Sequence, residues 1–412
     1  MGDLFHEELQ ALRARSLHRK LREIGSAQGS TVDLVGRRLV NFSSNDYLGL
    51  ANDSGLREAA ITAIQEFGVG AGASRLVSGT QSPHLQLESA LAKWKGTQAA
   101  LCFTSGYAAA VGTLPALASK NDVILLDKLC HASLIDGARL SGAALRVFPH
   151  NHLGKLESQL EWARRERPRA RIVVVTESIF SMDGDRAPIR QLVELKKKFD
   201  ALLLLDEAHA IGVLGANGRG LAVEQGVSED VDVQMGTLSK AIGVSGGYIC
   251  GSRSLIEWLI NRARSFIFST APPPGLAAAA VAAIDFLSSN EGENRRQLLW
   301  QKIGLMSRLL PDDPLTPAVK RPLPQSTIFP WIVGDEQMAI DFGRALINEG
   351  YLVPAIRYPT VAKGSARLRI TVTASHDDAQ IESFADALRR LSTSNLTDKL
   401  RGPGGRPVTE QR

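Results

Sequence analysis

Short apolar runs alternate with amphipathic stretches through the middle of the chain, from about residue 101 to residue 251. The runs are rich in Val, Ile and Leu, and the segments between them carry apolar residues at helical spacing. This alternation predicts an α/β fold, in which a large, mostly parallel sheet domain has helices on both faces. Its strands are expected at 101–106, 122–127, 171–178, 201–208, 232–239 and 247–251.

A second pattern follows the proline-rich segment "APPPG" at 271–275. After a long alanine-rich helix, the pattern predicts a smaller C-terminal α+β domain, with strands at 326–334, 351–356 and 366–372 and helices at 337–350 and 377–391. We therefore expect four parts: a helical N-terminal arm and turn (1–45), the large α/β domain (46–285), the small α+β domain (286–394) and a disordered tail (395–412).

The composition, 44% hydrophobic and 22% charged among 412 residues, is that of an ordinary globular protein. The net charge is +5, and part of it lies in two basic runs, 164–171 and 399–412. Because no basic segment is interleaved with aromatic residues, nucleic acid is not expected as a partner. No stretch of about 18 uncharged apolar residues occurs, which predicts no membrane span. Three scattered cysteines indicate neither disulfides nor a metal site, so we expect a cytoplasmic protein.

The run "LLLLDEAHAIGVLG" (202–215) ends in the titratable residues Asp206, Glu207 and His209. Its four leucines place Asp206 at the carboxyl end of a buried strand, where open α/β sheets bind their ligands. The letters D-E-A-H also occur in helicases, but the phosphate-binding loop that a helicase requires, G-x-x-x-x-G-K-[ST], is absent. The glycine-rich stretch 68–79 follows a helical pattern instead of a strand, so we expect a flexible loop there.

Lys240, in "GTLSKAIG", follows the next expected strand on a short glycine-flanked loop. A lysine there is a poor core residue but a good amine nucleophile. A Schiff-base lysine suits pyridoxal phosphate (PLP), which needs three further groups. Asp206 would pair with the pyridine nitrogen, the strand-to-helix turn at 104–109 would cradle the phosphate, and His131 would cover the ring. Each feature also has a structural explanation, because single histidines are often structural and a buried aspartate can cap a helix.

The order and spacing of these features resemble the α-oxoamine synthase family of fold-type I PLP-dependent transferases. The resemblance covers residues 40–392 and rests on eight segments: "NFSSNDYLGL" (41–50), "FTSGYAAAVG" (103–112), "HASLIDG" (131–137), "TESIFSMDGDRAP" (176–188), "DEAHAIGVLGANGRG" (206–220), "GTLSKAIG" (236–243), "FSTAPPP" (268–274) and "YPTVAKGSARLRIT" (358–371).

The resemblance implies roles for individual residues. The residues expected to act in catalysis are Lys240, His131, Asp206 and His209. The cofactor would contact Asp206 at its pyridine nitrogen and His209 and Ser181 near its ring hydroxyl, and its phosphate would contact Gly106, Tyr107 and Thr237. Ser269 and Thr270 would reach the phosphate of a neighbouring subunit, because family sites lie at a dimer interface. The substrates would contact Arg22, Asn45, His131, Thr360 and Arg367.

The reaction that the resemblance implies is a decarboxylative condensation of an amino acid with an acyl thioester. Within the family, the chain most resembles the member that joins L-alanine to a pimeloyl thioester in biotin biosynthesis. The thioester would be carried by CoA or by an acyl-carrier protein, and the protein would be a homodimer. A sister enzyme acting on glycine and acetyl-CoA, and more distantly a PLP aminotransferase, remain open as alternatives. A regulator that binds a metabolite on the same fold is less favoured, because Lys240, Asp206 and His131 are all present.

Overall fold

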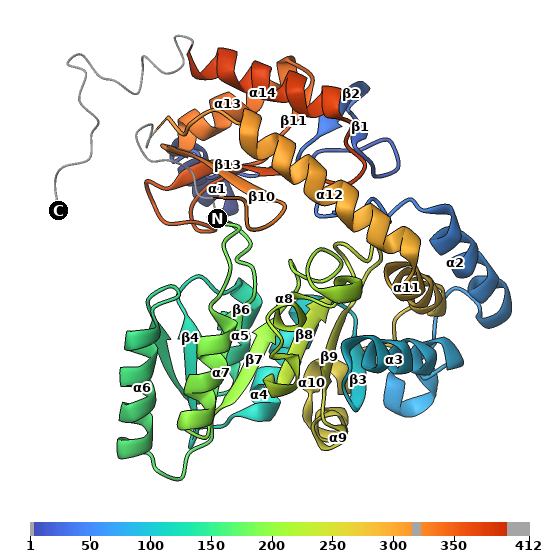
Figure 1. Cartoon of the computed structure of the whole chain (residues 1–412), viewed down its shortest axis with the longest axis vertical. Helices are drawn as coiled ribbons and strands as arrows, with labels where there is room; N and C mark the ends of the chain where they lie inside the picture. Colours follow the sequence, from blue (N-terminus) through green and yellow to red (C-terminus); the bar gives the residue numbers. More distant parts are fainter. Residues whose placement is uncertain (1–3, 315–322, 394–412) are drawn as a thin grey trace. The chain divides into compact units, whose positions relative to one another are not determined.

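In a computed structural model, residues 4–314 and 323–393 of the chain are described (Figure 1). The chain forms two compact units. The larger unit comprises Asn45–Ser181 and Asp185–Gln297, and the smaller unit comprises the residues up to Ser44, the segment Met182–Gly184 and the residues from Leu298 onward. The predicted disordered tail (395–412) lies outside the described residues, and the other predicted domain limits stay predictions.

The larger unit is built on a seven-stranded sheet with the order β3-β9-β8-β7-β6-β4-β5. Strands β8, β7, β6, β4 and β5 run parallel to one another, whereas β9 is antiparallel to both β8 and β3. The strands are β3 (Ala99–Phe103), β4 (Val123–Asp127), β5 (Ala144–Phe148), β6 (Ile172–Glu177), β7 (Leu202–Asp206), β8 (Val233–Thr237) and β9 (Gly247–Gly251). The predicted α/β class is confirmed, and the six predicted strands all form.

Strand β5 was not predicted. It lies at the edge of the sheet, and only Phe148 among its five residues is fully buried. Arg146 in its middle packs over the ring of Trp162, with 3.9 Å from the guanidinium carbon to the ring centroid. An edge strand of this kind lacks the continuous apolar run that identified its neighbours.

Helices cover both faces of this sheet, with α4 and α5 on one face and α6 and α7 on the other (Figure 1). Alternate strand residues such as Ile124 and Val175 pack with α4 and α5 in one core. The helices of the unit are α2 (Ser54–Phe67), α3 (Ser82–Lys95), α4 (Gly106–Leu117), α5 (Ala132–Leu140), α6 (Leu153–Glu166), α7 (Ile189–Lys198), α8 (Leu221–Glu224), α9 (Arg253–Arg262), α10 (Arg264–Ile267) and α11 (Pro274–Leu287). Helix α12 (Asn290–Leu309) has residues in both units.

The prediction of a flexible loop at 68–79 is wrong for the second half of this segment, because Arg75–Gly79 forms a π-helical turn. The cause is a buried ion pair: both terminal nitrogens of Arg75 donate to the carboxylate of Glu88 at 2.9 Å. Gly79 is required here, since a Cβ at this position would lie 2.1 Å from the carbonyl oxygen of Ala73. The partner carboxylate lies beyond the loop, so the local sequence did not reveal this turn.

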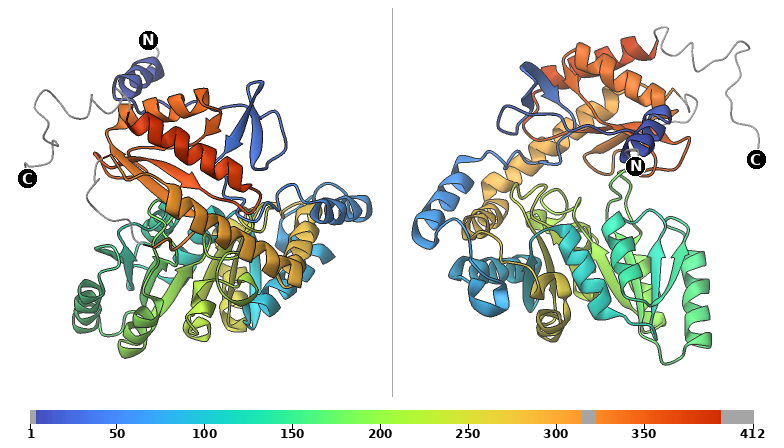
Figure 2. Two further views of the ribbon diagram at one scale, coloured as in Figure 1. Left: turned by 45° about the horizontal axis from the view of Figure 1, so that its top comes forward. Right: turned by 180° about the vertical axis from the view of Figure 1, so that it is seen from behind.

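The smaller unit contains two three-stranded sheets, ordered β1-β2-β11 and β10-β13-β12. Helix α13 packs on the second sheet and lies beside α14 (Figure 2). Its strands are β1 (Thr31–Leu34), β2 (Arg37–Asn41), β10 (Ile328–Gly334), β11 (Tyr351–Leu352), β12 (Ala355–Ile356) and β13 (Ala366–Thr371), and its helices are α1 (Leu4–Ala14), α13 (Glu336–Asn348) and α14 (Asp378–Ser392).

Two local features of this unit differ from the predictions. The expected helix of the arm forms as α1, but the rest of the arm is not a simple turn, because β1 and β2 form a hairpin whose two loop residues, Val35 and Gly36, have φ of 50° and 77°. A valine rarely adopts positive φ, so the usual Asn-Gly hairpin signal is missing. The strand expected at 351–356 is divided between the two sheets, because Pro354 has no N–H with which to continue a ladder.

None of the helices in the described parts of the chain is long and apolar enough to cross a membrane.

Candidate active site

The parallel strands of the larger unit bring several polar side chains to one edge of the sheet. Asp206 ends β7, and it is paired in register with Glu177 at the end of β6 and with Met235 in β8. Thr237 ends β8, and Lys240 follows it on the next loop. Carboxyl ends of parallel strands meet at the same edge, where ligands bind in open α/β sheets. The predicted residues Asp206, Thr237 and Lys240 are therefore brought together.

Asp206 is a buried carboxylate, only 6% exposed. Its Oδ1 accepts a hydrogen bond from the N–H of Ala208 at 2.9 Å. Burial raises the pKa of this carboxyl group, whereas the nearby charges of Lys240 and His131 act to lower it. A carboxylate with so little water favours a cationic partner. A protonated pyridine nitrogen would provide that partner, so Asp206 fits its predicted role.

His131 caps the N-terminus of α5, where its Nδ1 accepts from the N–H of Ser133 at 3.2 Å. The residue is exposed, but the protein around the ring removes part of its hydration and lowers its pKa. The charge of Asp206 opposes this shift and that of Lys240 reinforces it. A neutral, flat imidazole next to Lys240 suits the face of an aromatic cofactor.

Glu177 belongs to this site, and sequence reasoning missed it. Its carboxylate accepts the backbone N–H of His131 at 2.5 Å, which fixes the start of α5. Burial raises its pKa well above the ordinary value, the charge of Asp206 adds to this, and Lys240 opposes it. The signal was present, because Glu177 ends the apolar run "RIVVVTE" much as Asp206 ends its own run.

His209 is held by a second residue that was not singled out, Tyr47. The Tyr47 hydroxyl lies 2.6 Å from Nδ1 of His209, and it donates to Oδ1 of Asn45 at 3.2 Å. Both rings are buried, and Tyr47 is completely so. This chain of contacts orients the imidazole and brings the predicted substrate residue Asn45 close to it. Tyr47 lies within the motif "NFSSNDYLGL", and only the resemblance could have indicated it.

The turn predicted to hold the phosphate lies at the start of α4. Ser105 caps this helix, and its hydroxyl accepts the N–H of Ala108 at 3.0 Å. Within residues 4–314 and 323–393, no group accepts from the N–H of Gly106 or Tyr107, so these donors are available to an anion. A Cβ on Gly106 would lie 3.5 Å from the Thr237 hydroxyl, which shows how closely that side chain approaches. The geometry therefore fits a phosphate group.

Other predicted residues lie in different surroundings. Ser181 is buried in the larger unit, and Thr270 forms a β-bridge with Ser74, next to Ser269. Arg22, Thr360 and Arg367 belong to the smaller unit. There Nη1 of Arg367 binds Oδ1 of Asp183 at 2.6 Å and the carbonyl oxygen of Met182 at 3.1 Å. The functions of all these residues stay predictions.

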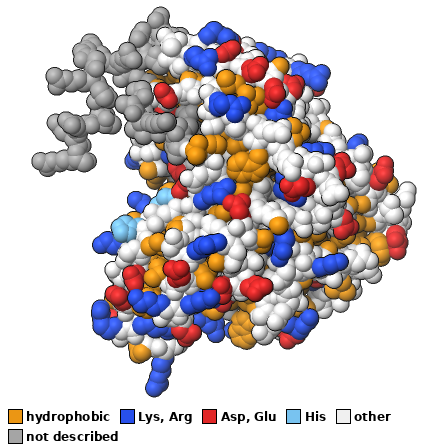
Figure 3. Space-filling model, in the orientation of Figure 1, with side chains coloured by type: hydrophobic (Ala, Val, Ile, Leu, Met, Phe, Trp, Pro, Cys, Tyr) orange, Lys and Arg blue, Asp and Glu red, His pale blue; other side chains and the backbone are white. Residues whose placement is uncertain are grey.

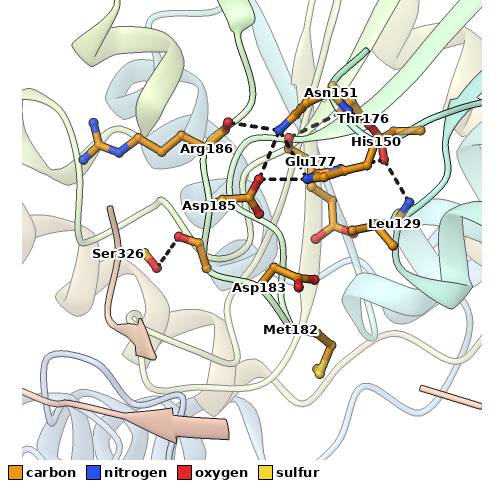
Figure 4. Close-up of polar contacts among 12 residues, drawn as sticks. Leu129, His150, Asn151, Thr176, Glu177, Met182, Asp183, Asp185, Arg186 and Ser326 are labelled. Atoms are coloured by element: carbon orange, nitrogen blue, oxygen red, sulfur yellow. Dashed lines mark hydrogen bonds and ion pairs between the residues drawn. The ribbon is translucent and has the colours of Figure 1, made fainter. Parts of the chain in front are cut away.

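A second polar cluster lies at the end of β4 and in the loops that follow β5 and β6 (Figure 4). Nδ1 of His150 lies 3.0 Å from Asp127, and Nε2 lies 2.8 Å from Asp185. We call these three residues the His150 clamp. Partial burial of the imidazole favours its neutral form, but hydrogen bonds to both carboxylates outweigh this and raise its pKa to about 10. The ring is therefore cationic at neutral pH.

The His150 clamp fixes the segment that leads into His131. The Asp127 carboxylate is completely buried and also accepts the N–H groups of Leu129, at 2.8 Å, and Asn151, at 2.8 Å. The side chain of Asn151 in turn donates to Asp185 at 3.1 Å (Figure 4). Sequence reasoning missed this cluster, because its members are 23 and 35 residues apart along the chain.

The fold and the site together define a PLP-dependent transferase of fold type I. The family described as "Aminotransferase class I and II" matches residues 37–388, so the chain belongs to this family. The predicted resemblance to α-oxoamine synthases is also confirmed. The chain is 46% identical over 384 residues to the 8-amino-7-oxononanoate synthase of Geobacter sulfurreducens, and the match covers 93% of this chain and 96% of that protein.

Two solved structures are also similar. Serine palmitoyltransferase of Sphingomonas wittichii has a TM-score of 0.86 and 32% identity, and the match covers 94% of this chain and 97% of that one. The 8-amino-7-oxononanoate synthase of Francisella tularensis has a TM-score of 0.71 and 28% identity, with coverage of 86% and 97%.

Proposed function

We propose that the protein joins L-alanine to a pimeloyl thioester in biotin biosynthesis. The products are 8-amino-7-oxononanoate, carbon dioxide and the free thiol carrier. The observation that carries this proposal is the gathering of Lys240, Asp206, His131 and His209 at one sheet edge, in a chain 46% identical to a synthase of that name. The acyl carrier is either CoA or an acyl-carrier protein.

PLP, when bound, supplies an aldehyde for Lys240 and an electron sink for the substrate. Asp206 would keep the pyridine nitrogen protonated, and His209, oriented by Tyr47, would hydrogen-bond the ring hydroxyl together with Ser181. The N–H groups of Gly106 and Tyr107 hold the phosphate with Thr237. The amine of Lys240 then takes the α-proton of the amino acid as general base.

The substrate contacts form the next part of the proposal. Asn45 and Arg367 bind the carboxylate of the amino acid, and Arg367 exchanges its ion pair with Asp183 for this ligand. Arg22 and Thr360 contact the acyl chain. The protein acts as a homodimer, in which Ser269 and Thr270 reach the cofactor phosphate of the neighbouring subunit. We place it in the cytoplasm, because Cys102, Cys130 and Cys250 are buried free thiols.

A substrate panel tests the proposal. Alanine, glycine and serine are each combined with pimeloyl, acetyl and palmitoyl thioesters, and thiol release is measured. We expect alanine with a pimeloyl thioester to exceed glycine with acetyl-CoA by at least roughly tenfold, a gap of about 1.4 kcal/mol. The reverse ranking would assign the chain to the glycine-specific sister enzyme. Transfer of an amino group without carbon dioxide release would instead indicate an aminotransferase.

The role of Lys240 has its own test, which does not depend on the substrate. The purified protein should be yellow, and borohydride should attach the cofactor to the peptide that contains "GTLSK". A Lys240→Ala protein should bind the cofactor without this attachment and should not turn over. Attachment at another lysine would refute the assignment.

A further inference from the structure

A cavity of about 850 Å³ lies within the smaller unit. The segment after α1 forms one side of it, and α13 and the residues around β12 form the other. The segment is fastened in place, because the Ser16 hydroxyl donates to Gln337 at 2.7 Å and the Arg357 guanidinium donates to the carbonyl oxygen of Ser16. The cavity is therefore a built feature of this unit.

The polar lining of the cavity is strongly cationic. Six of its side chains are basic: Arg13, Arg19, Lys20, Arg22, Arg344 and Arg357. His18 also lines it, and no aspartate or glutamate does so among the described residues. Arg344 has an acidic partner in Asp341, at 3.7 Å. For the other five basic residues, no carboxylate within residues 4–314 and 323–393 lies at ion-pair distance.

These cations are close enough to repel one another. Partial burial lowers the pKa of Arg357, the charges of Arg19 and Arg22 lower it further, and Glu336 opposes them. On the surface of the larger unit the charges are mixed instead, because basic and acidic side chains are interspersed there in Figure 3. Lys196, Lys197 and Lys198 of α7, for example, all form ion pairs. A concentration of cations around a cavity therefore favours a polyanionic ligand.

We infer that this cavity binds the phosphate groups of the acyl donor's phosphopantetheine carrier. This inference rests on the proposed function, because it assigns a subsite for the same thioester. The single carboxylate of a pimeloyl chain needs only one cation, and Arg22 already serves the acyl chain in the proposal. The other five match the several phosphate charges of CoA, of which the phosphodiester of a carrier protein's phosphopantetheine provides one, and the apolar wall formed by Ile340, Leu352 and Val353 suits the alkyl part of pantetheine.

The same phosphopantetheine chemistry occurs on CoA and on an acyl-carrier protein, so the test uses both. The variant combines Arg19→Gln, Lys20→Gln and Arg344→Gln, which removes three charges and leaves Arg22 and the Arg357 anchor intact. A matched control combines Arg57→Gln, Lys155→Gln and Arg169→Gln, which are exposed positions of the larger unit. The KM for alanine and for three donors is measured: pimeloyl-CoA, the pimeloyl-carrier protein, and pimeloyl-pantetheine, which has no phosphate.

We expect the cavity variant to raise the KM of at least one phosphorylated donor by roughly tenfold or more. The KM for pimeloyl-pantetheine and for alanine should change less than about twofold, and the control should match the wild type. A higher KM for pimeloyl-CoA alone identifies CoA as the carrier, and a higher KM for the pimeloyl-carrier protein alone identifies that protein. Three outcomes would overturn the inference: an equal rise in the KM for pimeloyl-pantetheine, an equal rise in the control variant, or an unchanged KM for both phosphorylated donors.

Two further measurements separate this inference from the proposed function and from misfolding. Direct binding of CoA and of holo-carrier protein to the holoenzyme, by calorimetry, needs no turnover. If alanine and pimeloyl donors give no product, the proposed function fails, whereas weaker binding in the cavity variant alone still supports the anion site. In the wild type, inorganic pyrophosphate should compete with the phosphorylated donor and not with pimeloyl-pantetheine. Absence of this competition counts against the inference even if the variant does not fold.

Discussion

Replacing His150 with glutamine should destabilise the protein in a way that depends on pH. The imidazolium of the His150 clamp binds the Asp127 and Asp185 carboxylates, at 3.0 and 2.8 Å. Partial burial disfavours its charge, but these two partners dominate and raise its pKa from 6.5 to about 10. Glutamine is polar and of similar size, but it has no charge to pair with the completely buried Asp127.

The magnitude follows from the difference in proton binding between the folded and unfolded states. A pKa raised from 6.5 to about 10 corresponds to at most about 5 kcal/mol of stabilisation. The imidazole is 25% exposed, and solvent screening reduces this to about 2–3 kcal/mol near neutral pH. For a unit of this size, such a loss lowers the melting temperature by about 4–10 °C.

The sign of the pH dependence distinguishes a charge effect from simple loss of packing. Because the folded pKa lies above the unfolded one, the stabilisation is complete below about pH 6.5 and is lost as the pH rises through about 10. Thermal unfolding of wild-type and His150→Gln holoenzymes, at constant ionic strength from pH 6 to pH 10.5, should show a difference that shrinks steadily. His6→Gln, at an exposed position of α1, is the control. A difference that stays constant across this range would refute the reasoning.

Three other substitutions follow from buried contacts. Asp206→Ala should weaken cofactor binding by about 3–5 kcal/mol, measured by absorbance titration with PLP. If this variant exchanged the α-proton at the wild-type rate, the carboxylate would be only structural. Tyr47→Phe removes the 2.6 Å contact to His209 and should lower kcat about tenfold; an unchanged kcat would contradict this. Lys95→Met leaves Glu207, which is completely buried, without its 2.6 Å ion-pair partner and should cost about 3–5 kcal/mol in urea unfolding. The double variant with Glu207→Gln should recover part of this loss, and no recovery would refute the pairing.

The sequence predicted the parts of the fold that depend on continuous local patterns. Strands β4, β6 and β7 are buried on both faces, so each appears as an apolar run, and a run of this kind needs no knowledge of its neighbours. The β1–β2 hairpin and the π-helical turn at Arg75–Gly79 were missed for different reasons. The first has an unusual turn residue, Val35, and the second depends on Glu88, which lies 13 positions from Arg75.

In the candidate site, too, the sequence predicted the residues that follow local patterns and missed those that depend on distant partners. Asp206 and Lys240 follow apolar strands and could be found from position and chemistry, and the resemblance then supplied His209, Ser181 and Thr237. By contrast, Tyr47 is 162 residues from His209 in the chain, although their side chains are 2.6 Å apart. Only the folded structure brings these two residues together. Residues that orient other residues are therefore the part of a site that sequence reasoning finds least often.

Charge balance explains why the two proposed ligand sites differ. At the sheet edge of the larger unit, the chain provides its own cations: Lys95 pairs with Glu207, and His150 pairs with Asp127 and Asp185. In the proposed mechanism, Asp206 is buried close to Lys240, whose amine takes part in the reaction, so the pyridinium of the cofactor would balance the charge of Asp206. The cavity of the smaller unit shows the opposite imbalance, with cations and no lining carboxylate among the described residues. A ligand that brings several negative charges resolves that imbalance, whereas the amino acid, with one carboxylate, would leave most of it in place.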